Sequence, residues 1–181
     1  WYTYPVTAVF TCRGCTYNCK TCGGSARTFR SIANRKQPAY RDPKLLAKDI
    51  FNIADHLNAP VMIIGDIFQP GENYAFTFLK EMKEKPVSNH IAFEFFVPPK
   101  RHQLERIAES ITHFNIEISP ESHDEEIRRA FGRPYDNPSL ERMIRDAIEF
   151  GCKRIDVFFM TGLPKQSAQS ALDIVDYCRS L

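Results

Sequence analysis

Cysteines provide the clearest chemical signal in this chain. Four of its six cysteines lie within eleven residues, in the stretch "TCRGCTYNCKTCGGS", with the spacing C-x₂-C-x₃-C-x₂-C. A structural zinc site normally takes its ligands from two separate CxxC elements, and a three-residue gap leaves a tight path for that. A four-iron–four-sulfur cube can take its ligands from one wrapped loop. Gly14, Gly23 and Gly24 supply the backbone freedom that such wrapping needs.

The bulk composition argues against disulfides and against a membrane span. Disulfide-rich secreted proteins are small and poor in core, whereas this chain has 181 residues, of which 43% are hydrophobic, and it clusters its thiols. A metal site in a reducing compartment is therefore favoured, and a soluble, cytoplasmic protein is expected. The net charge of +2 gives no signal for nucleic acid or an anionic membrane, and the apolar runs are too short to cross a bilayer. Cys152 and Cys178, outside the cluster, are expected to be core thiols.

Five short apolar runs, rich in Val, Ile and Phe, alternate with patterns of helical period. Near-continuous apolarity is typical of strands that are buried on both faces of a parallel sheet. The runs cover residues 5–11, 59–65, 90–97, 114–119 and 154–162.

Between and after these runs, apolar residues recur every three or four positions, which predicts helices. Asp42 before Pro43 is typical of a helix start, and Gly151 of a helix end. The expected helices contain Leu46–Leu57, Ala75–Met82, Leu104–Ile111, Leu140–Ile148 and Ala168–Val175.

Five strand–helix units in succession predict an α/β fold, namely a partial parallel (β/α) barrel; a doubly wound open sheet also fits. The series stops on a helix with an apolar face, so we expect the last unit or units to be absent. Since the chain begins at Trp1, residues 1–181 are interpreted as one domain cut from a longer chain.

Residues 23–41 are expected to form a long irregular loop, which is basic and contains no acidic residue. A solvated loop accounts for this pattern, and a contact for an anionic substrate or a neighbouring domain is the alternative.

The subset Cys15-x₃-Cys19-x₂-Cys22, just after the first strand, resembles the signature of radical S-adenosylmethionine (SAM) enzymes. The resemblance implies that these three cysteines bind three irons of a 4Fe-4S cluster. The fourth iron is then left for the amino and carboxylate groups of SAM, and Cys12 is left without a ligand role. The family has an aromatic residue before the last cysteine, where this chain has Thr21; its backbone could still contact adenine, and Tyr17 is the aromatic residue of the loop.

Two stretches in the middle of the chain resemble further SAM-binding elements of that family. Gly65-Asp66, after the second strand, is similar to the turn that receives the SAM amino group; a plain turn or helix cap is the alternative. In "ISPESHDEEIRRAFGRPY", Glu121 and Ser122 match the pair near the ribose hydroxyls. Arg133 matches the residue that faces the methionine carboxylate, with a solvated arginine as the alternative.

A further likeness lies after the fifth strand. The turn "TGLPKQS" is similar to a Gly-Leu-Pro turn of the family, in which Gly162 would let the backbone approach the adenine. A tight strand-to-helix turn explains the same residues without a ligand.

The resemblance implies an enzyme that cleaves SAM reductively and starts radical chemistry on an unreactive C–H bond, using an electron from a reductant such as flavodoxin or ferredoxin. "IIGDIFQPGENYAFTFL" and the Glu-Ser strand look most like members that carry a cobalamin-binding domain ahead of the barrel. Methyl transfer or another C–H functionalisation is therefore favoured, and a methylthiotransferase-like RNA modifier is a second possibility. A non-catalytic iron–sulfur (electron-transfer) or zinc-binding module remains the alternative from another class; the substrate is unknown.

Overall fold

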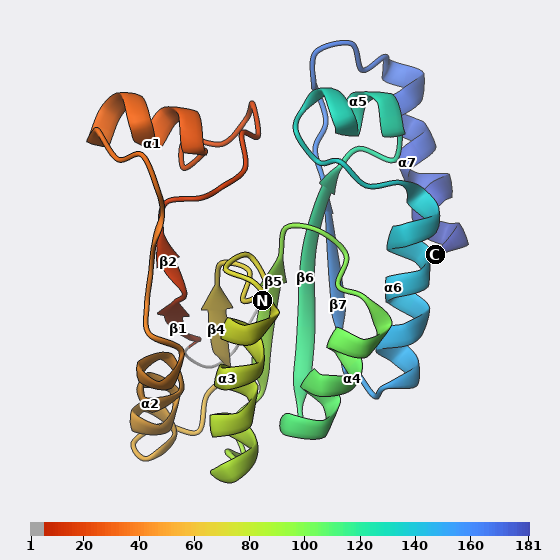
Figure 1. The fold of residues 1–181 in the computed structure, drawn as a ribbon. Helices are drawn as coiled ribbons and strands as arrows, with labels where there is room; N and C mark the ends of the chain where they lie inside the picture. Colours follow the sequence, from red (N-terminus) through yellow and green to blue (C-terminus); the bar gives the residue numbers. More distant parts are fainter. Residues whose placement is uncertain (1–5) are drawn as a thin grey trace.

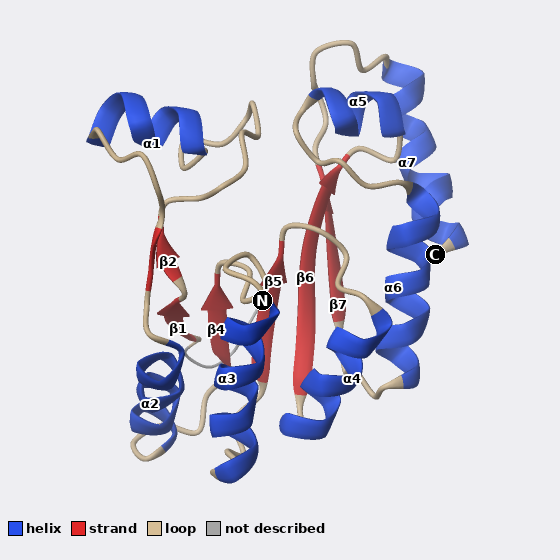
Figure 2. Ribbon diagram, viewed as in Figure 1, coloured by secondary structure: helices blue, strands red, loops and turns tan. Residues whose placement is uncertain are grey.

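A computed structural model describes residues 6–181, which fold around a sheet of five parallel strands (Figures 1 and 2). The strands lie in the order β1-β4-β5-β6-β7, so strands that follow one another along this series are neighbours in space. Their bounds are Thr7–Phe10 for β1, Val61–Ile64 for β4, Ile91–Phe95 for β5, Phe114–Glu121 for β6 and Ile155–Phe159 for β7.

A helix follows each of these strands along the chain. The helices are α2 (Pro43–Ala54), α3 (Glu72–Glu84), α4 (Arg101–Ser110), α6 (Asn137–Glu149) and α7 (Ala168–Ser180). The buried apolar residues of α2, α3, α4 and α6 pack with one face of the sheet into a single core, of which Phe78, Phe93 and Leu140 are fully or almost fully buried members. The predicted five strand–helix units and the partial parallel (β/α) barrel are thus confirmed.

The two faces of the sheet differ in burial. Side chains alternate along a strand, so Val9 and Phe93 point into the helix-covered core while Phe10 and Glu94 lie on the opposite face. This opposite face is partly open at the sheet's outer strands, where Phe10 is 61% and Phe158 49% exposed. The prediction that both faces are buried is therefore wrong for β1 and β7.

Most predicted boundaries lie within a few residues of the observed ones. As predicted, the side chain of Asp42 caps α2, accepting hydrogen bonds from the amides of Lys44 and Leu45. The helix ends at Ala54, so Leu57, predicted inside it, lies beyond its end. Gly151 follows α6 with a positive φ of 84°, as expected of a helix terminator. Pro5, assigned to the first strand, lies outside the described residues.

Residues 23–41 are more ordered than predicted. They contain α1 (Ala26–Ala33), which starts at Ser25 because the Ser25 side chain accepts a hydrogen bond from the Thr28 amide. They also contain β3 (Ala39–Tyr40), which pairs antiparallel with β2 (Cys12–Arg13). The prediction of a wholly irregular loop is therefore wrong, although α1 buries none of its residues.

Three smaller features complete the fold. A short helix, α5 (Glu125–Ala130), lies between β6 and α6, and with α1 it lies near the end of the molecule toward which the strand arrows point (Figure 1). Cys152 is partly buried against the core, but Cys178 is exposed, so Cys178 is not the core thiol that we predicted. Within residues 6–181, no helix combines the length and the apolarity that crossing a bilayer requires.

Candidate functional site

All four clustered cysteines line one cavity of about 200 Å³, which we call the inner cavity. It lies where the loop after β1 meets the carboxyl ends of β4 and β5, the edge at which parallel α/β barrels bind ligands. Three further predicted site residues, Tyr17, Gly65 and Arg133, line the same cavity. The remaining walls come from Gly14, Gly24, Phe29, Ile64, Glu94 and Phe96.

Hydrogen-bond donors face two of the cysteine sulfurs. The amide of Tyr17 donates to Cys15 Sγ at 3.4 Å, and the amide of Gly24 donates to Cys22 Sγ at 3.3 Å. The side-chain amide of Gln69, from the turn after β4, also donates to Cys15 Sγ at 3.1 Å. Such donors stabilise the negative charge of a thiolate, which is the form of cysteine that binds metal.

The segment after α5, which contains Gly132, packs against the cysteine loop. Gly132 packs so closely that a Cβ at this position would lie 3.0 Å from Cys19 Cα, and its φ of +98° also disfavours any side chain. Next to it, the amide of Lys20 donates to the carbonyl of Phe131 at 3.1 Å. The position of Cys19 is therefore set by a contact between segments more than 100 residues apart.

Gly65 follows β4 on the cavity wall and packs closely against Thr11, the residue after β1. A Cβ on Gly65 would lie 2.3 Å from Thr11 Oγ1, and its φ is +96°, so only glycine fits here. The Gly65 amide donates to Glu94 Oε2 at 2.7 Å. The carboxylate of Glu94 is thereby fixed at the cavity wall, beside the cysteines.

Asp66 is 3% exposed and does not line the inner cavity. Its carboxylate accepts hydrogen bonds from the amides of Phe68, at 2.8 Å, and Phe96, at 3.2 Å, and so ties the turn after β4 to the end of β5. Burial raises the pKa of Asp66 to about 6, and the backbone hydrogen bonds offset part of that rise.

Arg133 and Glu121 form a pair beside the cavity. Arg133 Nη2 lies 3.3 Å from Glu121 Oε1, and both side chains are largely buried. Glu121 has a φ of 68°, in the left-handed region that non-glycine residues rarely adopt, at an irregularity in the pairing of β6 with β7. Arg133 Nε is buried and, among residues 6–181, has no hydrogen-bond partner. A guanidinium with a free donor on a cavity wall is suited to binding an anion.

Ser122 serves a structural network rather than the cavity wall. It is fully buried; its hydroxyl accepts a hydrogen bond from the Asp124 amide, and its carbonyl accepts two from Arg128, at 3.0 and 2.8 Å. Arg128 is itself fully buried and also donates to the carbonyl of Tyr135 at 3.1 Å and to the side chain of Asn137. This network ties the end of β6 to the segment that carries Gly132 and Arg133.

Thr21 and Gly162 lie outside the inner cavity. Both are exposed, and a Cβ on Gly162 would meet no atom within 4 Å. Their predicted contacts with adenine stay predictions.

Burial and a neighbouring charge act in opposite directions on the Cys19 thiol. Burial raises its pKa, and the guanidinium of Arg133 partly counteracts this rise. Arg133 therefore favours the thiolate at the same cavity wall where it could hold an anion.

The sequence analysis missed Glu94, Gln69 and Arg128. A signal for Glu94 was present, because it is the one charged residue inside the apolar run of β5. Gln69 and Arg128 lie in polar segments where nothing distinguishes them from exposed residues until the chain is folded.

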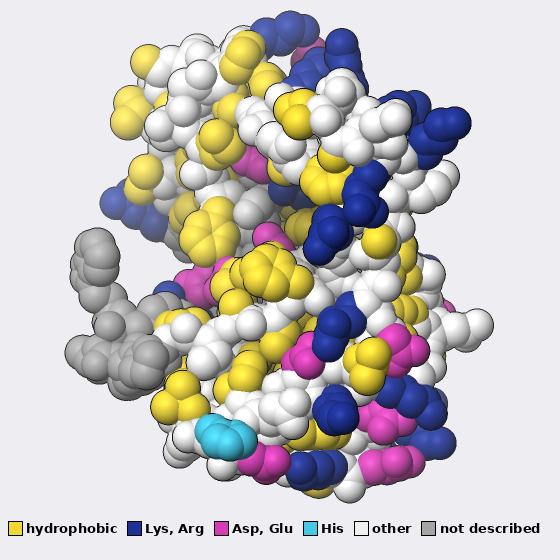
Figure 3. Space-filling model, turned by 90° about the vertical axis from the view of Figure 1, so that its left-hand side faces the viewer, with side chains coloured by type: hydrophobic (Ala, Val, Ile, Leu, Met, Phe, Trp, Pro, Cys, Tyr) yellow, Lys and Arg dark blue, Asp and Glu magenta, His cyan; other side chains and the backbone are white. Residues whose placement is uncertain are grey.

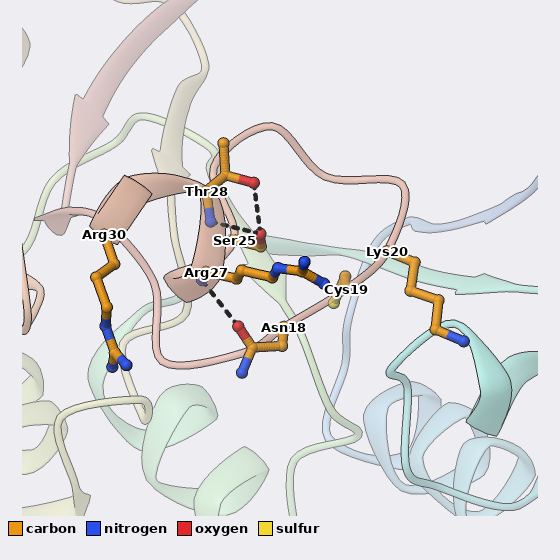
Figure 4. Close-up of a pocket in the computed structure, with 7 residues that line it drawn as sticks. All are labelled: Asn18, Cys19, Lys20, Ser25, Arg27, Thr28 and Arg30. Carbon is orange, nitrogen blue, oxygen red and sulfur yellow. Dashed lines mark hydrogen bonds between the residues drawn. The ribbon is translucent and has the colours of Figure 1, made fainter. Parts of the chain in front are cut away.

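A second pocket, of about 680 Å³, is lined by the cysteine loop and α1, and we call it the outer pocket. Its lining includes Cys19, which thus borders both spaces, and the basic residues Lys20, Arg27 and Arg30. In Figure 4, Arg27 and Arg30 extend from α1, whereas Lys20 extends from the cysteine loop toward α5, where its Nζ lies 5.8 Å from the centroid of the Phe131 ring. None of the three forms an ion pair within residues 6–181. On the face in Figure 3, Lys and Arg lie in both the upper and the lower part, and few Asp or Glu lie among those of the upper part.

The residues of the inner cavity fit a cubane cluster with SAM. Three cysteine sulfurs on one cavity wall, two of them with N–H donors, match the ligand set of a 4Fe-4S cluster. The unpartnered Nε of Arg133 matches a carboxylate beside it. Among the described residues, no three His, Cys, Asp or Glu side chains converge on one metal ion. In a cubane cluster each cysteine sulfur binds a different iron, so the ligands surround a larger volume than the ligands of a single metal ion do.

Comparisons with known proteins agree with this picture. The model of the family described as "Radical SAM superfamily" matches residues 9–178. The fold is similar to methylornithine synthase (PylB), with a TM-score of 0.61 and 13% identity over 92% of this chain and 47% of that one. It is also similar to the FeFe-hydrogenase maturase HydG from Carboxydothermus hydrogenoformans, with a TM-score of 0.58 and 16% identity over 87% and 36% of the two chains. The chain thus spans less than half the length of these structures, and no curated protein sequence matches it.

Proposed function

This chain belongs to the radical SAM superfamily, and from that premise we propose that its inner cavity holds a 4Fe-4S cluster and SAM for radical chemistry. The observation that carries the proposal is the convergence of Cys15, Cys19, Cys22 and Arg133 on that cavity. When bound, the two cofactors supply reductive cleavage of SAM and a radical that takes hydrogen from an unreactive C–H bond.

In this proposal Cys15, Cys19 and Cys22 ligate three irons, and Cys12 does not. Cys12 lines the same cavity, but it lies in β2, where it pairs with Tyr40 across the antiparallel ribbon. Its Sγ is 3.1 Å from the carbonyl of Gly14. The Cys12 thiol donates a hydrogen bond to that carbonyl, which favours the neutral form of Cys12 over the thiolate that a metal requires.

For the methionine part of SAM, Arg133 is proposed to bind the carboxylate through its free Nε. Gly65 and Asp66 remain the predicted site for the amino group, and we add Glu94, because its carboxylate lines the cavity and Asp66 does not. Glu94 is held there by the Gly65 amide, so the two proposals involve the same turn.

For the nucleoside part, Glu121 and Ser122 are proposed to lie near the ribose, with Tyr17, Thr21 and Gly162 near the adenine. The pairing of Glu121 with Arg133 supports a position next to the carboxylate site. Tyr17 lines the cavity and packs edge-on against Phe96, which supports an aromatic wall for a flat base.

The partner that supplies the electron is proposed to be an acidic reductant such as flavodoxin or ferredoxin, in the cytoplasm. The outer pocket supports this, because three basic side chains without an ion pair among the described residues line it together with Cys19, which also lines the inner cavity. One-electron transfer at this surface would then cross only the cysteine loop.

A narrower proposal is methyl transfer or a related C–H functionalisation, with cobalamin bound by a domain outside this chain. Its support is the sequence resemblance of residues 63–79 and of the Glu-Ser strand to members with such a domain. Cobalamin binding by the full-length protein, followed by its absorption spectrum, tests it; a full-length protein that binds none refutes it.

The main proposal is tested by anaerobic reconstitution of the full-length protein with iron and sulfide, followed by dithionite and SAM. We expect 5′-deoxyadenosine to form, and Cys15→Ala to form none. Cys152→Ala is the matched control, because Cys152 lies outside the cysteine loop, and it should retain the activity.

The same samples separate the non-catalytic alternatives. Zinc without acid-labile sulfide would identify a zinc module. A cluster that dithionite reduces but that leaves SAM intact would identify an electron-transfer module.

A further inference from the structure

Among the described residues, Gln69 is the one side-chain donor to the sulfur of Cys15, Cys19 or Cys22. Its Nε2 lies 3.1 Å from Cys15 Sγ, and it comes from the turn after β4, 54 residues along the chain. The other donors to these sulfurs are the amides of Tyr17 and Gly24, each two residues beyond its cysteine, as any tight loop around a cluster would provide. Gln69 is therefore a contact that the fold, and not the loop itself, brings to the sulfur.

Two contacts hold the Gln69 side chain in this orientation. Its Oε1 accepts a hydrogen bond from the hydroxyl of Tyr40 at 3.1 Å. The backbone amide of Gln69 donates to the carbonyl of Asp66 at 3.1 Å, within the turn that the buried Asp66 carboxylate also ties down. Since a thiolate accepts hydrogen bonds only, the amide must present its NH₂ group to Cys15 and its oxygen to Tyr40.

We propose that Gln69 sets the reduction potential of the cluster by donating a hydrogen bond to the Cys15 thiolate, with Tyr40 as a positioning residue that acts through Gln69. This inference rests on the proposed function, because it requires Cys15 to be a cluster ligand. Reduction adds one electron to the cluster, which places more negative charge on the cysteine sulfurs. A donor to a sulfur therefore stabilises the reduced state more than the oxidised state and makes reduction easier.

The experiment is an anaerobic redox titration of the reconstituted protein without SAM, with the reduced cluster measured by electron paramagnetic resonance. We expect Gln69→Leu to lower the equilibrium constant for reduction about tenfold, or about 59 mV for a one-electron couple. Tyr40→Phe should lower it about two- to threefold, because the amide keeps its donor but loses its fixed orientation. The double variant should match Gln69→Leu alone, since Tyr40 has no route to the sulfur without Gln69.

Gln37→Leu is the matched control. Gln37 is an exposed glutamine of the residue 34–38 segment, beside a small pocket that Cys15 also lines, and it has no hydrogen bond to any sulfur in the described chain. It should leave the potential unchanged.

The outcomes separate this inference from the proposed function. If the wild-type protein holds no cluster, both fail. If it holds one and Gln69→Leu retains its iron and sulfide with the wild-type potential, this inference alone is wrong. If Gln69→Leu loses the cluster, Tyr40→Phe decides, and an unchanged potential in that variant overturns the inference.

Discussion

The cysteine-bearing segment, residues 11–41, and the strand–helix body that follows it are stabilised in different ways. The first 41 residues contain seven Lys and Arg and no Asp or Glu, although the whole chain is nearly neutral. Helix α1 of this segment buries no residue, whereas α2, α3 and α6 of the body each bury three or four. The body is thus held by its core, and the segment by a few specific contacts.

Those contacts lie where the segment touches the body. Thr11 approaches Gly65, the amide of Thr11 donates to the carbonyl of Ile64, and Cys19 and Lys20 pack against Phe131–Gly132. A segment held in this way can wrap a cofactor without rearranging the core. We therefore expect substitutions in the segment to change cofactor binding and substitutions in the core to change folding stability, each without the other.

The largest expected effect is loss of the cluster without loss of the fold. Cys15→Ala, Cys19→Ala and Cys22→Ala should each reduce the bound iron to near background after reconstitution, because a three-ligand site cannot spare one ligand. Iron and sulfide analysis measures this, with circular dichroism as the check on the body. Cys12→Ala should retain the iron; its loss would show that Cys12 is a ligand and refute the assignment of the open iron.

The second largest expected effect is on the free energy of unfolding, which should depend on side-chain burial in the body but not in the segment. Phe93→Ala, at a position 1% exposed, should lower the free energy of unfolding by about 3–5 kcal/mol, because it leaves a cavity in the core. Ile32→Ala on α1, at a position 81% exposed, should change it by less than about 0.5 kcal/mol. Urea unfolding of both variants measures this, and similar values would contradict the difference between the regions.

The third effect is a pH dependence that belongs to the body. Burial raises the pKa of Asp66 to about 6 from an ordinary value of 3.8, so between these pH values the folded chain holds a proton that the unfolded chain has released. The stability due to this proton is full below about pH 4 and is lost as the pH rises through 6.

Asp66→Asn removes that titration. The difference in unfolding free energy between wild type and Asp66→Asn should fall by about 3 kcal/mol from pH 4 to pH 7, since one pKa unit corresponds to about 1.4 kcal/mol. Urea unfolding of the two proteins at a series of pH values measures it. A difference that does not vary with pH would mean that Asp66 titrates normally when folded.

The smallest effect concerns the contact that holds the cysteine segment. Gly132→Ala places a side chain at a positive φ, which costs about 1–2 kcal/mol, and also presses a Cβ against Cys19. We expect weaker iron retention during gel filtration and faster proteolysis of residues 11–41.

Gly151→Ala is the control for that variant. Its φ is also positive, at +84°, but a Cβ there meets no atom within 4 Å. It should show the backbone cost in urea unfolding and keep the iron of the wild type. Equal iron loss in both variants would show that the Gly132 contact does not matter.

The sequence predicted the body better than the cysteine segment. Apolar runs and helical periods follow from burial, which is strong in the body, and all five strand–helix units were found from them. Helix α1 was missed although Ala26, Phe29 and Ala33 recur at helical spacing, because it is only eight residues long and buries none of them. The pairing of β2 with β3 involves only two residues per strand. The burial of the sheet face opposite to the helices was also predicted wrongly, because Phe10 and Phe158 are apolar and yet exposed.

The site divides in the same way. The spacing of Cys15, Cys19 and Cys22 is local, so the sequence alone indicated the family, in agreement with the family match over residues 9–178. Which other side chains meet these sulfurs was decided only by the tertiary structure. Gln69 reaches the Cys15 sulfur from 54 residues away, and Glu94 reaches the cavity wall from more than 70 residues away. These contacts depend on how the fold brings the strand ends together. The spacing of residues along the sequence does not show which distant residues lie close in space.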